Sequence, residues 1–316
     1  MQEFGLQVLK PQFLCISLRK QSYDFFHFRA MNIILFSRKQ VNHRPEQLRT
    51  ILYEIERHNM DYVVNEEFAA AVEALTDIRI DAAHLFSDKP RATGNDIMIT
   101  YGGDGTLLEA VSLLPSADIP VVGINCGRLG YLTADDGAGI EELFTAIAEG
   151  NLRFEERLML TIDGMAEECI ALNEISVHRN SASMVSVETL INGNYVATYY
   201  GDGLVVATPT GSTAYSLSAG GPIVDPMCRC FVLSPIAPHN LTMRPVVIPD
   251  SSIVTLRIHS RGGEALISAD NRTYTILDGG EVRVRLAERR VILAMPHNNT
   301  FYDTLREKMM WGVDKR

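Results

Sequence analysis

The 316-residue chain lacks several features that would place it in a class at once. Its five cysteines are scattered without a CxxC pair, so we expect neither a disulfide framework nor a structural zinc site. Cysteine usage of this kind is typical of a reducing compartment, and we expect the cytoplasm. No apolar run approaches the roughly 20 residues that a membrane-spanning helix needs, so no membrane association is expected.

The chain is also poor in positive charge. It carries 29 Lys and Arg residues against 39 Asp and Glu residues, which gives a formal net charge of −10. A nucleic-acid surface needs a basic patch, so we expect no nucleic-acid partner. A GxxxxGK(S/T) loop is missing as well, which argues against a Walker-type NTPase. An anionic small ligand is not excluded, because backbone amides, a helix N-terminus and a divalent ion can hold phosphates locally.

The length and the residue pattern divide the chain into parts. A chain of 316 residues favours two domains over one. The first 30 residues contain phenylalanines with no clear period, and a strand pattern begins just after Met31. We expect a disordered or extraneous extension at 1–30, an α/β domain at 31–152, a β-rich domain at 153–295, and a C-terminal segment at 296–316 that packs back on the first domain.

Strand and helix patterns alternate along residues 31–152. Short apolar runs such as 32–36, 97–100 and 120–124 predict buried strands, and segments with helical spacing separate them. Alternation of this kind gives a mostly parallel sheet with helices on both faces. Ligands of such sheets bind outside the carboxyl ends of the strands, where residues 102–106 and 125–130 fall.

From about residue 153 the pattern changes to a series of short strands. Runs such as 158–162, 170–177 and 185–191 are bounded by turn residues, and similar runs continue to residue 295. Asn192-Gly193 lies between two of them and strongly predicts a hairpin. We therefore expect an antiparallel, all-β second domain that resembles a sandwich.

A glycine-rich turn follows the apolar run at 97–100. It reads Gly102-Gly103-Asp104-Gly105-Thr106, and helix-forming residues come directly after it. Glycines let backbone N–H groups approach a phosphate closely. A carboxylate has little reason to lie among phosphates unless it binds a metal or takes a proton. The turn alone is a weak signal, because Gly and Asp are also common in plain turns that begin a helix.

Three further segments carry polar residues in unexpected places. The stretch 208–222 is dense in Gly, Ser and Thr, and its Tyr215 is suited to stacking on a ring; a long solvated loop is the alternative. Asn173 and Glu174 interrupt an apolar strand pattern, so they either grip ribose hydroxyls or mark an edge or a bulge. Asp202 lies between two glycines, where a plain turn is the default interpretation.

Together these segments resemble the NAD kinase family, ATP-dependent enzymes that phosphorylate the adenosine ribose 2′-hydroxyl of NAD. The resemblance runs from Met31 to the end of the chain. The GGDGT turn alone is shared with diacylglycerol and sphingosine kinases and, loosely, with phosphofructokinases. The stretch TPTGSTAYSLSAGGPIVDP at 208–226 is far more specific, as is the pair Asn173-Glu174 upstream of Asp202.

The resemblance implies a fold, cofactors, partners and site residues. The fold would be a Rossmann-like N-terminal domain with a β-rich C-terminal domain, assembled as a homodimer or homotetramer. ATP would be the phosphoryl donor and NAD the acceptor. Mg²⁺ would be the metal, and the resemblance does not assign its protein ligands. Asp104 would accept the proton, and Asp202 would reach the NAD of a neighbouring subunit. The implied NAD-binding residues are Asp104, Gly105, Asn173, Glu174, Asp202, Thr213, Ala214, Tyr215, Ser216, Leu217 and Ser218, and the implied phosphate-binding residues are Gly102, Gly103 and Thr106.

Some positions depart from the family pattern. Glu109 stands where many relatives carry Arg or Gly, Tyr200 stands near a frequent Arg, and Asn271-Arg272 replaces a frequent Gly-Gln. These differences bear on the choice of donor and on NAD versus NADH, and not on the reaction class. Two other classes stay open: a lipid kinase of the diacylglycerol or sphingosine type, which would need an apolar pocket, and a non-catalytic NAD sensor, in which Asp104 would have little use.

Overall fold

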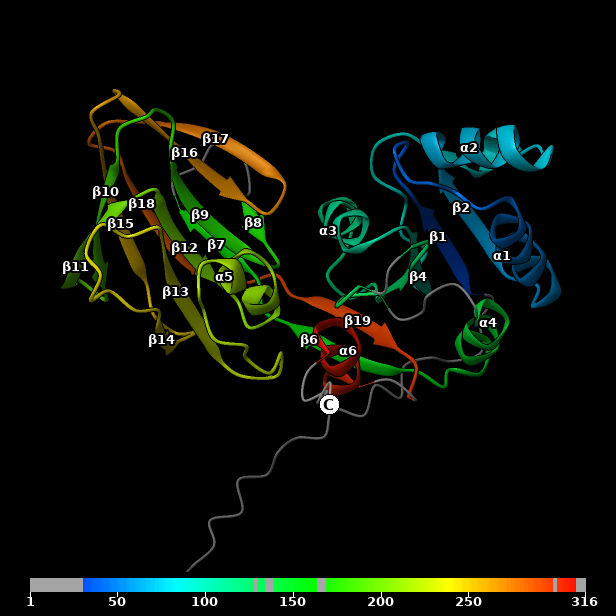
Figure 1. The fold of residues 1–316 in the computed structure, drawn as a ribbon. Coiled ribbons are helices and arrows are strands. Elements are labelled where there is room, and N and C mark those ends of the chain that lie inside the picture. Colours follow the sequence, from blue (N-terminus) through cyan, green and yellow to red (C-terminus); the bar gives the residue numbers. More distant parts are fainter. Residues whose placement is uncertain (1–30, 128–129, 134–138, 164–168, 298–299, 311–316) are drawn as a thin grey trace, which may run out of the picture.

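The computed structural model describes residues 31–127, 130–133, 139–163, 169–297 and 300–310. It consists of an α/β domain and a β-rich domain, with strands β6 (Arg153–Arg157) and β19 (Val291–Met295) at the junction between them (Figure 1). The extension expected at 1–30 lies outside the described residues. In the described part, no helix combines the length and the apolar character that a membrane span requires.

The first domain is built around one sheet. Its further elements are β1 (Asn32–Phe36), α1 (Pro45–Arg57), β2 (Asp61–Asn65), α2 (Glu66–Thr76), η1 (Ala82–His84), β3 (Leu85–Phe86), β4 (Asp96–Tyr101), α3 (Asp104–Leu113), β5 (Val121–Ile124) and α4 (Ile140–Glu149). The seven strands follow the order β3-β2-β1-β4-β5-β19-β6, and only the pairing of β6 with β19 is antiparallel. Strands β1, β4 and β5 are buried along their whole length, as expected where helices cover both faces. The predicted α/β class is confirmed.

The helices of this domain lie on both faces of the sheet. Helix α1 begins at Pro45, a favoured first helical residue, and buries Leu48, Ile51 and Ile55 at helical spacing. It packs against α2 and α4, whereas α3 packs on β4 and β5. Figure 1 shows α3 on the side of the sheet that faces the second domain. The glycine-rich turn before α3 therefore opens toward the space between the domains.

Strands β6 and β19 correct the expected boundary between the domains. The sequence pattern placed residues 153–157 and 291–295 in the β-rich domain, because the series of short strands begins near residue 153 and continues to residue 295. In the structure they complete the first sheet, where Leu293 of β19 pairs with Val121 of β5. Every residue of β19 is buried. A continuous apolar run such as VILAM is typical of a parallel strand covered on both faces, not of a half-exposed antiparallel one.

The second domain packs two antiparallel sheets face to face. Its strands are β7 (Leu160–Asp163), β8 (Ile170–Ala171), β9 (Glu174–Arg179), β10 (Val185–Ile191), β11 (Asn194–Gly201), β12 (Gly203–Ala207), β13 (Cys230–Ile236), β14 (Val246–Pro249), β15 (Val254–Ser260), β16 (Glu264–Ala269), β17 (Arg272–Leu277) and β18 (Glu281–Leu286). One six-stranded sheet has the order β11-β10-β15-β18-β7-β8, and the other has β14-β13-β12-β9-β16-β17. Apolar residues from both sheets form one core. The predicted sandwich-like class is confirmed, and so is the hairpin at Asn192-Gly193, where both φ angles are positive.

The strand expected at 170–177 is wrong as a continuous element. The chain ends β8 at Ala171 and begins β9 at Glu174, and these two strands belong to different sheets. The polar Asn173 lies in the gap, so it marks the point where the chain changes sheets. This break places Asn173 and Glu174 at the end of the sandwich nearest α3.

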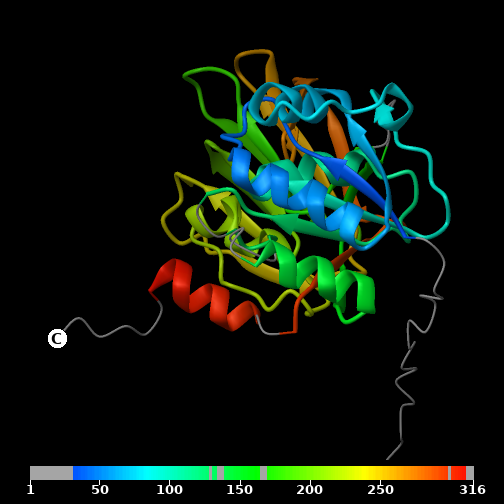
Figure 2. The ribbon, with the colours of Figure 1, turned by 90° about the vertical axis from the view of Figure 1, so that its right-hand side faces the viewer.

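Three short helices complete the fold. The turn η2 (Thr210–Thr213) and α5 (Tyr215–Ser218) pack over β12 and β13. Helix α6 (Phe301–Met309) forms a separate layer along the lower edge of the molecule, drawn in red in Figure 2. Its Tyr302 hydroxyl donates to Asp225 of the second domain at 2.6 Å, and its Lys308 lies beside Asp104 of the first. The C-terminal segment thus contacts both domains, not the first alone.

Candidate functional site

The glycine-rich turn connects β4 to α3 in a tight bend. A Cβ atom at Gly102 would lie 2.3 Å from the Thr106 hydroxyl oxygen, so the bend has no room for a larger residue. Gly103 precedes the helix, and Asp104 is its first residue. The first backbone N–H groups of a helix lack partners within it, and the helix dipole favours negative charge there. The turn therefore combines a helix N-terminus with one carboxylate at the sheet's carboxyl edge.

The Asp104 carboxylate is fixed by backbone amides from the loop after β5. Tyr131 N donates to Oδ2 at 2.8 Å, and Leu132 N donates to Oδ1 at 3.1 Å. A Cβ atom at Gly130 would lie only 1.9 Å from Asp104 Oδ1, so glycine is required for this approach. Each carboxylate oxygen can accept more than one hydrogen bond, so the group is oriented and still able to meet a ligand.

Two cations stand near this turn. The Lys308 ammonium lies 4.0 Å from Asp104 Oδ2 and 4.2 Å from the centre of the Tyr131 ring. Burial lowers the pKa of Lys308, and the neighbouring Asp104 acts in the opposite direction. Arg38 reaches the other side of the turn, where its guanidinium would be 3.3 Å from a Cβ atom at Gly105. Positive charge is therefore concentrated at one point of an acidic chain.

A buried carboxylate organises the second wall of the site. Asp270, in the turn between β16 and β17, accepts hydrogen bonds from the amides of Leu172 at 2.7 Å, Asn173 at 2.9 Å and Glu174 at 3.1 Å. Burial raises the pKa of Asp270, and the three amide donors and Arg272 oppose that rise. These bonds satisfy the amides at the break between β8 and β9, which would otherwise lack strand partners.

Glu174 is the most perturbed acid of this wall. Burial, and secondarily the negative charge of Asp270, raises the pKa of Glu174 to about 8, although a backbone hydrogen bond from Tyr215 opposes the shift. Its Oε2 atom is buried without a hydrogen-bond partner among the described residues. A carboxyl group that is largely neutral at pH 7 can both donate and accept a hydrogen bond. It is therefore suited to a ligand hydroxyl.

A pocket of about 510 Å³ lies beside the C-terminal end of β9, and Tyr215, whose backbone bonds Glu174, is part of its lining. Tyr215 lines it and stacks on His178 with the ring centres 5.5 Å apart. Asp202 also lines it and forms an ion pair with Arg179 at 2.6 Å. The volume is in the range of small-molecule sites, and the mostly polar lining suits a polar ligand.

The turn at 270–272 joins the two walls. Asn271 Nδ2 donates to the Gly105 carbonyl oxygen at 3.4 Å, directly beside Asp104. A second pocket of about 280 Å³ lies between α3 and this turn, lined among others by Glu109 and Arg272. Asn173, Glu174 and Tyr215 thus lie together on one wall, Asp104 and Gly105 lie on the other, and the Asp270-Asn271 turn contacts both.

Comparison with known proteins decides the family. A family model of the ATP-NAD kinase N-terminal domain matches residues 32–152, and a model of the ATP-NAD kinase C-terminal domain matches residues 172–294. The NAD kinase of Bacteroides fragilis is 36% identical over 291 residues, which cover 90% of this chain and 100% of that protein. The NAD kinase of Christiangramia forsetii is 36% identical over 83% of this chain and 92% of its own length.

The chain belongs to the NAD kinase family. Family membership gives the reaction class, a kinase acting on NAD, and it separates the chain from the lipid kinases that share the GGDGT turn. Among solved structures, yeast NADH kinase complexed with NADH superposes with a TM-score of 0.77 at 25% identity, covering 91% of this chain and 89% of that one. An NAD kinase from Archaeoglobus fulgidus in complex with ATP gives a TM-score of 0.69 at 26% identity, covering 87% and 99%.

Several hydroxyl side chains in the stretch 208–222 bond within the protein, which the sequence did not predict. Thr208 Oγ1 donates to the Leu172 carbonyl, Ser212 Oγ donates to the Val224 carbonyl, and Ser216 Oγ meets Ser234 Oγ at 2.9 Å in the interior. Hydroxyls that bond inside the protein are not directed at a ligand. The side chain of Tyr215 and the exposed residue Ser218 face outward instead. The implied NAD-binding roles of all six residues from Thr213 to Ser218 stay predictions.

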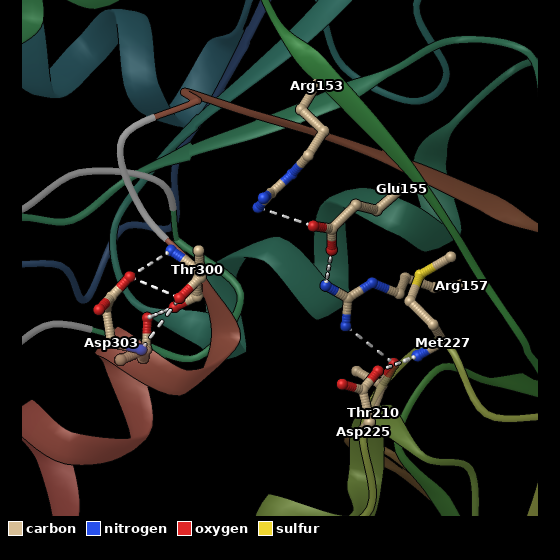
Figure 3. A network of polar contacts seen from close by, with 9 residues as sticks. Arg153, Glu155, Arg157, Thr210, Asp225, Met227, Thr300 and Asp303 are labelled. Atoms are coloured by element: carbon tan, nitrogen blue, oxygen red, sulfur yellow. Dashed lines mark hydrogen bonds and ion pairs between the residues drawn. The ribbon is translucent and has the colours of Figure 1, made fainter.

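A polar network holds this stretch at the junction between the domains (Figure 3). Arg157 of β6 is buried, and its guanidinium contacts Glu155 and donates to Thr210 Oγ1 at 3.4 Å. Burial lowers the pKa of Arg157, and Glu155 counteracts it. Arg153 binds the other oxygen of Glu155 at 2.8 Å. The junction strand thereby fixes the start of the segment that carries Tyr215.

The sequence reasoning missed several residues of the site. Lys308 comes from the last described helix, about 200 positions after Asp104, and no motif surrounds it. The amides of Tyr131 and Leu132 carry no residue-type signature, although Gly130 at a strand's carboxyl end was a usable signal. Asp270 was noticed only as part of a variable turn, yet three amides in one carboxylate give it a defined role.

The residues present suit Mg²⁺ only as a companion of nucleotide phosphates. Within the described ranges, no group of three or more His, Cys, Asp and Glu residues could hold a metal ion. Mg²⁺ is often bound through substrate phosphates with few protein ligands and several waters, and it need not have a complete protein cage. A glycine turn at a helix N-terminus fits phosphates of that kind.

Proposed function

We propose that this chain transfers the γ-phosphoryl group of ATP to the 2′-hydroxyl of the adenosine ribose of NAD, with Asp104 as the proton acceptor. The observation that carries the proposal is the Asp104 carboxylate itself. It stands at the N-terminus of α3 and is oriented by the amides of Tyr131 and Leu132. Its neighbour Gly105 accepts a hydrogen bond from Asn271, in the turn that holds the backbone of Glu174. A phosphate site and a hydroxyl-binding wall therefore meet at one carboxylate.

Catalysis of phosphoryl transfer rests mainly on positioning and on charge stabilisation. A ribose hydroxyl is a weak acid, so Asp104 orients it and accepts its proton late in the attack. General-base help of this kind is typically worth about 10²–10⁴ in rate. The amide of Gly103 binds phosphate oxygens in this proposal, whereas those of Gly102 and Thr106 already donate to the carbonyls of Ile124 at 2.8 Å and Gly103 at 2.9 Å. Mg²⁺, when bound with ATP, neutralises part of the phosphate charge.

The second wall binds NAD in this proposal. Asn173 and Glu174 receive ribose hydroxyls, for which the neutral Glu174 carboxyl supplies both a donor and an acceptor. Tyr215 stacks on a base in the pocket of about 510 Å³. Asp202, on the exposed rim of that pocket, reaches the NAD of a neighbouring subunit, so the working enzyme is a homo-oligomer. Its four described cysteines are free, in keeping with a cytoplasmic enzyme.

One assay tests the reaction. The purified chain is incubated with ATP, Mg²⁺ and NAD. The product is measured with an NADP-specific dehydrogenase, which accepts only the dinucleotide that carries the 2′-phosphate. We expect NADP to form in proportion to enzyme and to depend on ATP. Parallel reactions contain NADH, or a diacylglycerol, in place of NAD. NAD binding without NADP formation would select a sensor and refute the proposal, and so would a product from the lipid alone.

A further inference from the structure

Lys308 is a cation beside Asp104 that the mechanism above does not use. Its ammonium lies 4.0 Å from Asp104 Oδ2 and 4.2 Å above the centre of the Tyr131 ring. The Lys308 side chain is 24% exposed and that of Asp104 is 30% exposed. Both side chains are thus partly shielded from solvent.

The contact with Asp104 does not account for Lys308. A separation of 4.0 Å is longer than a hydrogen bond, and Oδ2 already accepts one from Tyr131 N. Among the described residues, no hydrogen bond uses the Lys308 ammonium, which has three donors. A partly exposed ion pair of this length contributes little to stability. The face of the Tyr131 ring holds the cation in place and leaves its N–H groups uncommitted.

The helix that carries Lys308 is anchored at its other end. Thr300 and Asp303 form a capping box at the start of α6. The Tyr302 hydroxyl donates to Asp225 at 2.6 Å, and Leu305 is buried. The Tyr302 contact holds the start of the helix against the second domain. The position of Lys308 beside Asp104 is therefore a property of the fold and not of a free terminus.

The geometry points to Lys308 as a catalytic cation that binds an oxygen of the phosphoryl group in transfer. The inference rests on the proposed function in one respect, that the 2′-hydroxyl attacks beside Asp104. The hydroxyl oxygen must come within about 3 Å of the carboxylate, and the γ-phosphorus lies next to that oxygen. A cation 4.0 Å from Oδ2 is then within reach of the phosphoryl oxygens.

The step balances without a further reactant. A bond forms between the 2′-oxygen of NAD and the γ-phosphorus, and the bond from that phosphorus to the bridging oxygen breaks. ADP leaves with the electron pair of that bond, and Asp104 receives the hydroxyl proton. Lys308 keeps its proton and stabilises charge on the phosphoryl oxygens. Among the described residues, Arg38 is a second cation beside the turn, but its guanidinium already faces the Glu109 carboxylate at 3.6 Å. Lys308 is therefore the better placed of the two to meet the phosphoryl group.

The test replaces Lys308 with Met and, separately, with Arg. Loss of one positioned charge-stabilising donor typically lowers kcat by about 10²–10³, and we expect Lys308→Met to fall in this range. The KM for NAD should change by less than about threefold, because the second wall is intact. Lys308→Arg should recover at least about tenfold of the loss, since the charge returns. Arg306→Met is the matched control, because it removes an exposed cation from the same helix.

A double variant separates this inference from the role of Asp104. If Lys308 binds the phosphoryl group directly, adding Lys308→Met to Asp104→Asn lowers the residual rate further. If it adds nothing, Lys308 acts only through Asp104 and the inference is overturned. Near-wild-type kcat in Lys308→Met, or an equal loss in Arg306→Met, would also overturn it. If Asp104→Asn kept wild-type turnover while Lys308→Met was slow, the result would refute Asp104 as the general base and support Lys308 as the catalytic cation. Thermal melts of every variant confirm folding.

Discussion

Asp104→Asn tests the centre of the proposed mechanism, and the structure sets the size of its two effects. The carboxylate accepts Tyr131 N and Leu132 N on different oxygens. An Asn amide offers one oxygen and one NH₂ group, so one of these amides would face another donor. A buried unmet donor costs about 1–3 kcal/mol. Because the Asp104 side chain is 30% exposed, water relieves part of this, and we expect roughly 1 kcal/mol.

The effect on catalysis should be larger than the effect on folding. Loss of the proton acceptor should lower kcat by at least about a hundredfold, which is roughly 2.7 kcal/mol of barrier. A stability loss near 1 kcal/mol lowers the melting temperature by only about 2–4 °C for a chain of this size. The assay couples NADP formation to an NADP-specific dehydrogenase at saturating NAD and ATP, so that kcat alone is compared.

Asp96→Asn is the matched control for this variant. Asp96 begins β4 at the opposite end from the glycine turn and is buried. It likewise accepts backbone amides, from Thr93 at 2.7 Å and Gly94 at 3.0 Å, and also the Asn32 side chain at 2.6 Å. Its replacement should cost at least as much stability and leave kcat near the wild-type value. Turnover of Asp104→Asn within about tenfold of wild type would refute the general-base role.

Three further predictions follow from other contacts. Gly130→Ala places a Cβ atom 1.9 Å from Asp104 Oδ1, so kcat should fall by about tenfold or more. Gly127→Ala is the control: its Cβ atom meets nothing closer than 3.9 Å, so it should retain activity in the same assay. Asp270→Asn leaves one of three amides without an acceptor, so steady-state kinetics should show the KM for NAD raised about tenfold and melts should show stability lower by about 1–3 kcal/mol. Glu174→Gln should raise the melting temperature at pH 8. The pKa of Glu174 is about 8 in the folded protein against an ordinary 4.5, so at pH 8 the wild type loses stability because its unfolded chain releases a proton that the folded chain still partly holds. Wild-type stability therefore declines as pH rises from 4.5 to about 8. Thermal melts across this range should show the free energies of unfolding of the two proteins converging toward pH 4.5 and differing by roughly a few kcal/mol above pH 8.

The parts of the fold with a strong local pattern could be predicted. The apolar run at β4, the glycines after it and the Asn192-Gly193 hairpin are encoded within a few residues, and the structure has them as expected. The assignment of β19 could not be made in this way. A five-residue apolar strand is compatible with either domain, and only its burial on both faces decides.

The candidate site was predictable where side chains carry the chemistry. Asp104, Asn173 and Glu174 are unusual residue types in their positions, which is why the sequence pointed to them; their ligand roles stay predictions. The contacts that orient them come from backbone amides or from distant segments, such as Asp270, about 100 residues after Leu172, and Lys308. Backbone donors have no residue-type signature, and contacts over such separations depend on the topology.

The placement of β6 and β19 has a consequence for the order in which the protein is completed during synthesis. Strand β5 needs β19 as its neighbour, and β19 ends at Met295. All strands of the sandwich, up to Leu286, leave the ribosome before β19 does. The second domain can therefore close while the first sheet still has an open edge at β5, a pairing hazard until β19 arrives. The domain that begins the chain is the last to be finished, and Lys308 joins Asp104 only after that.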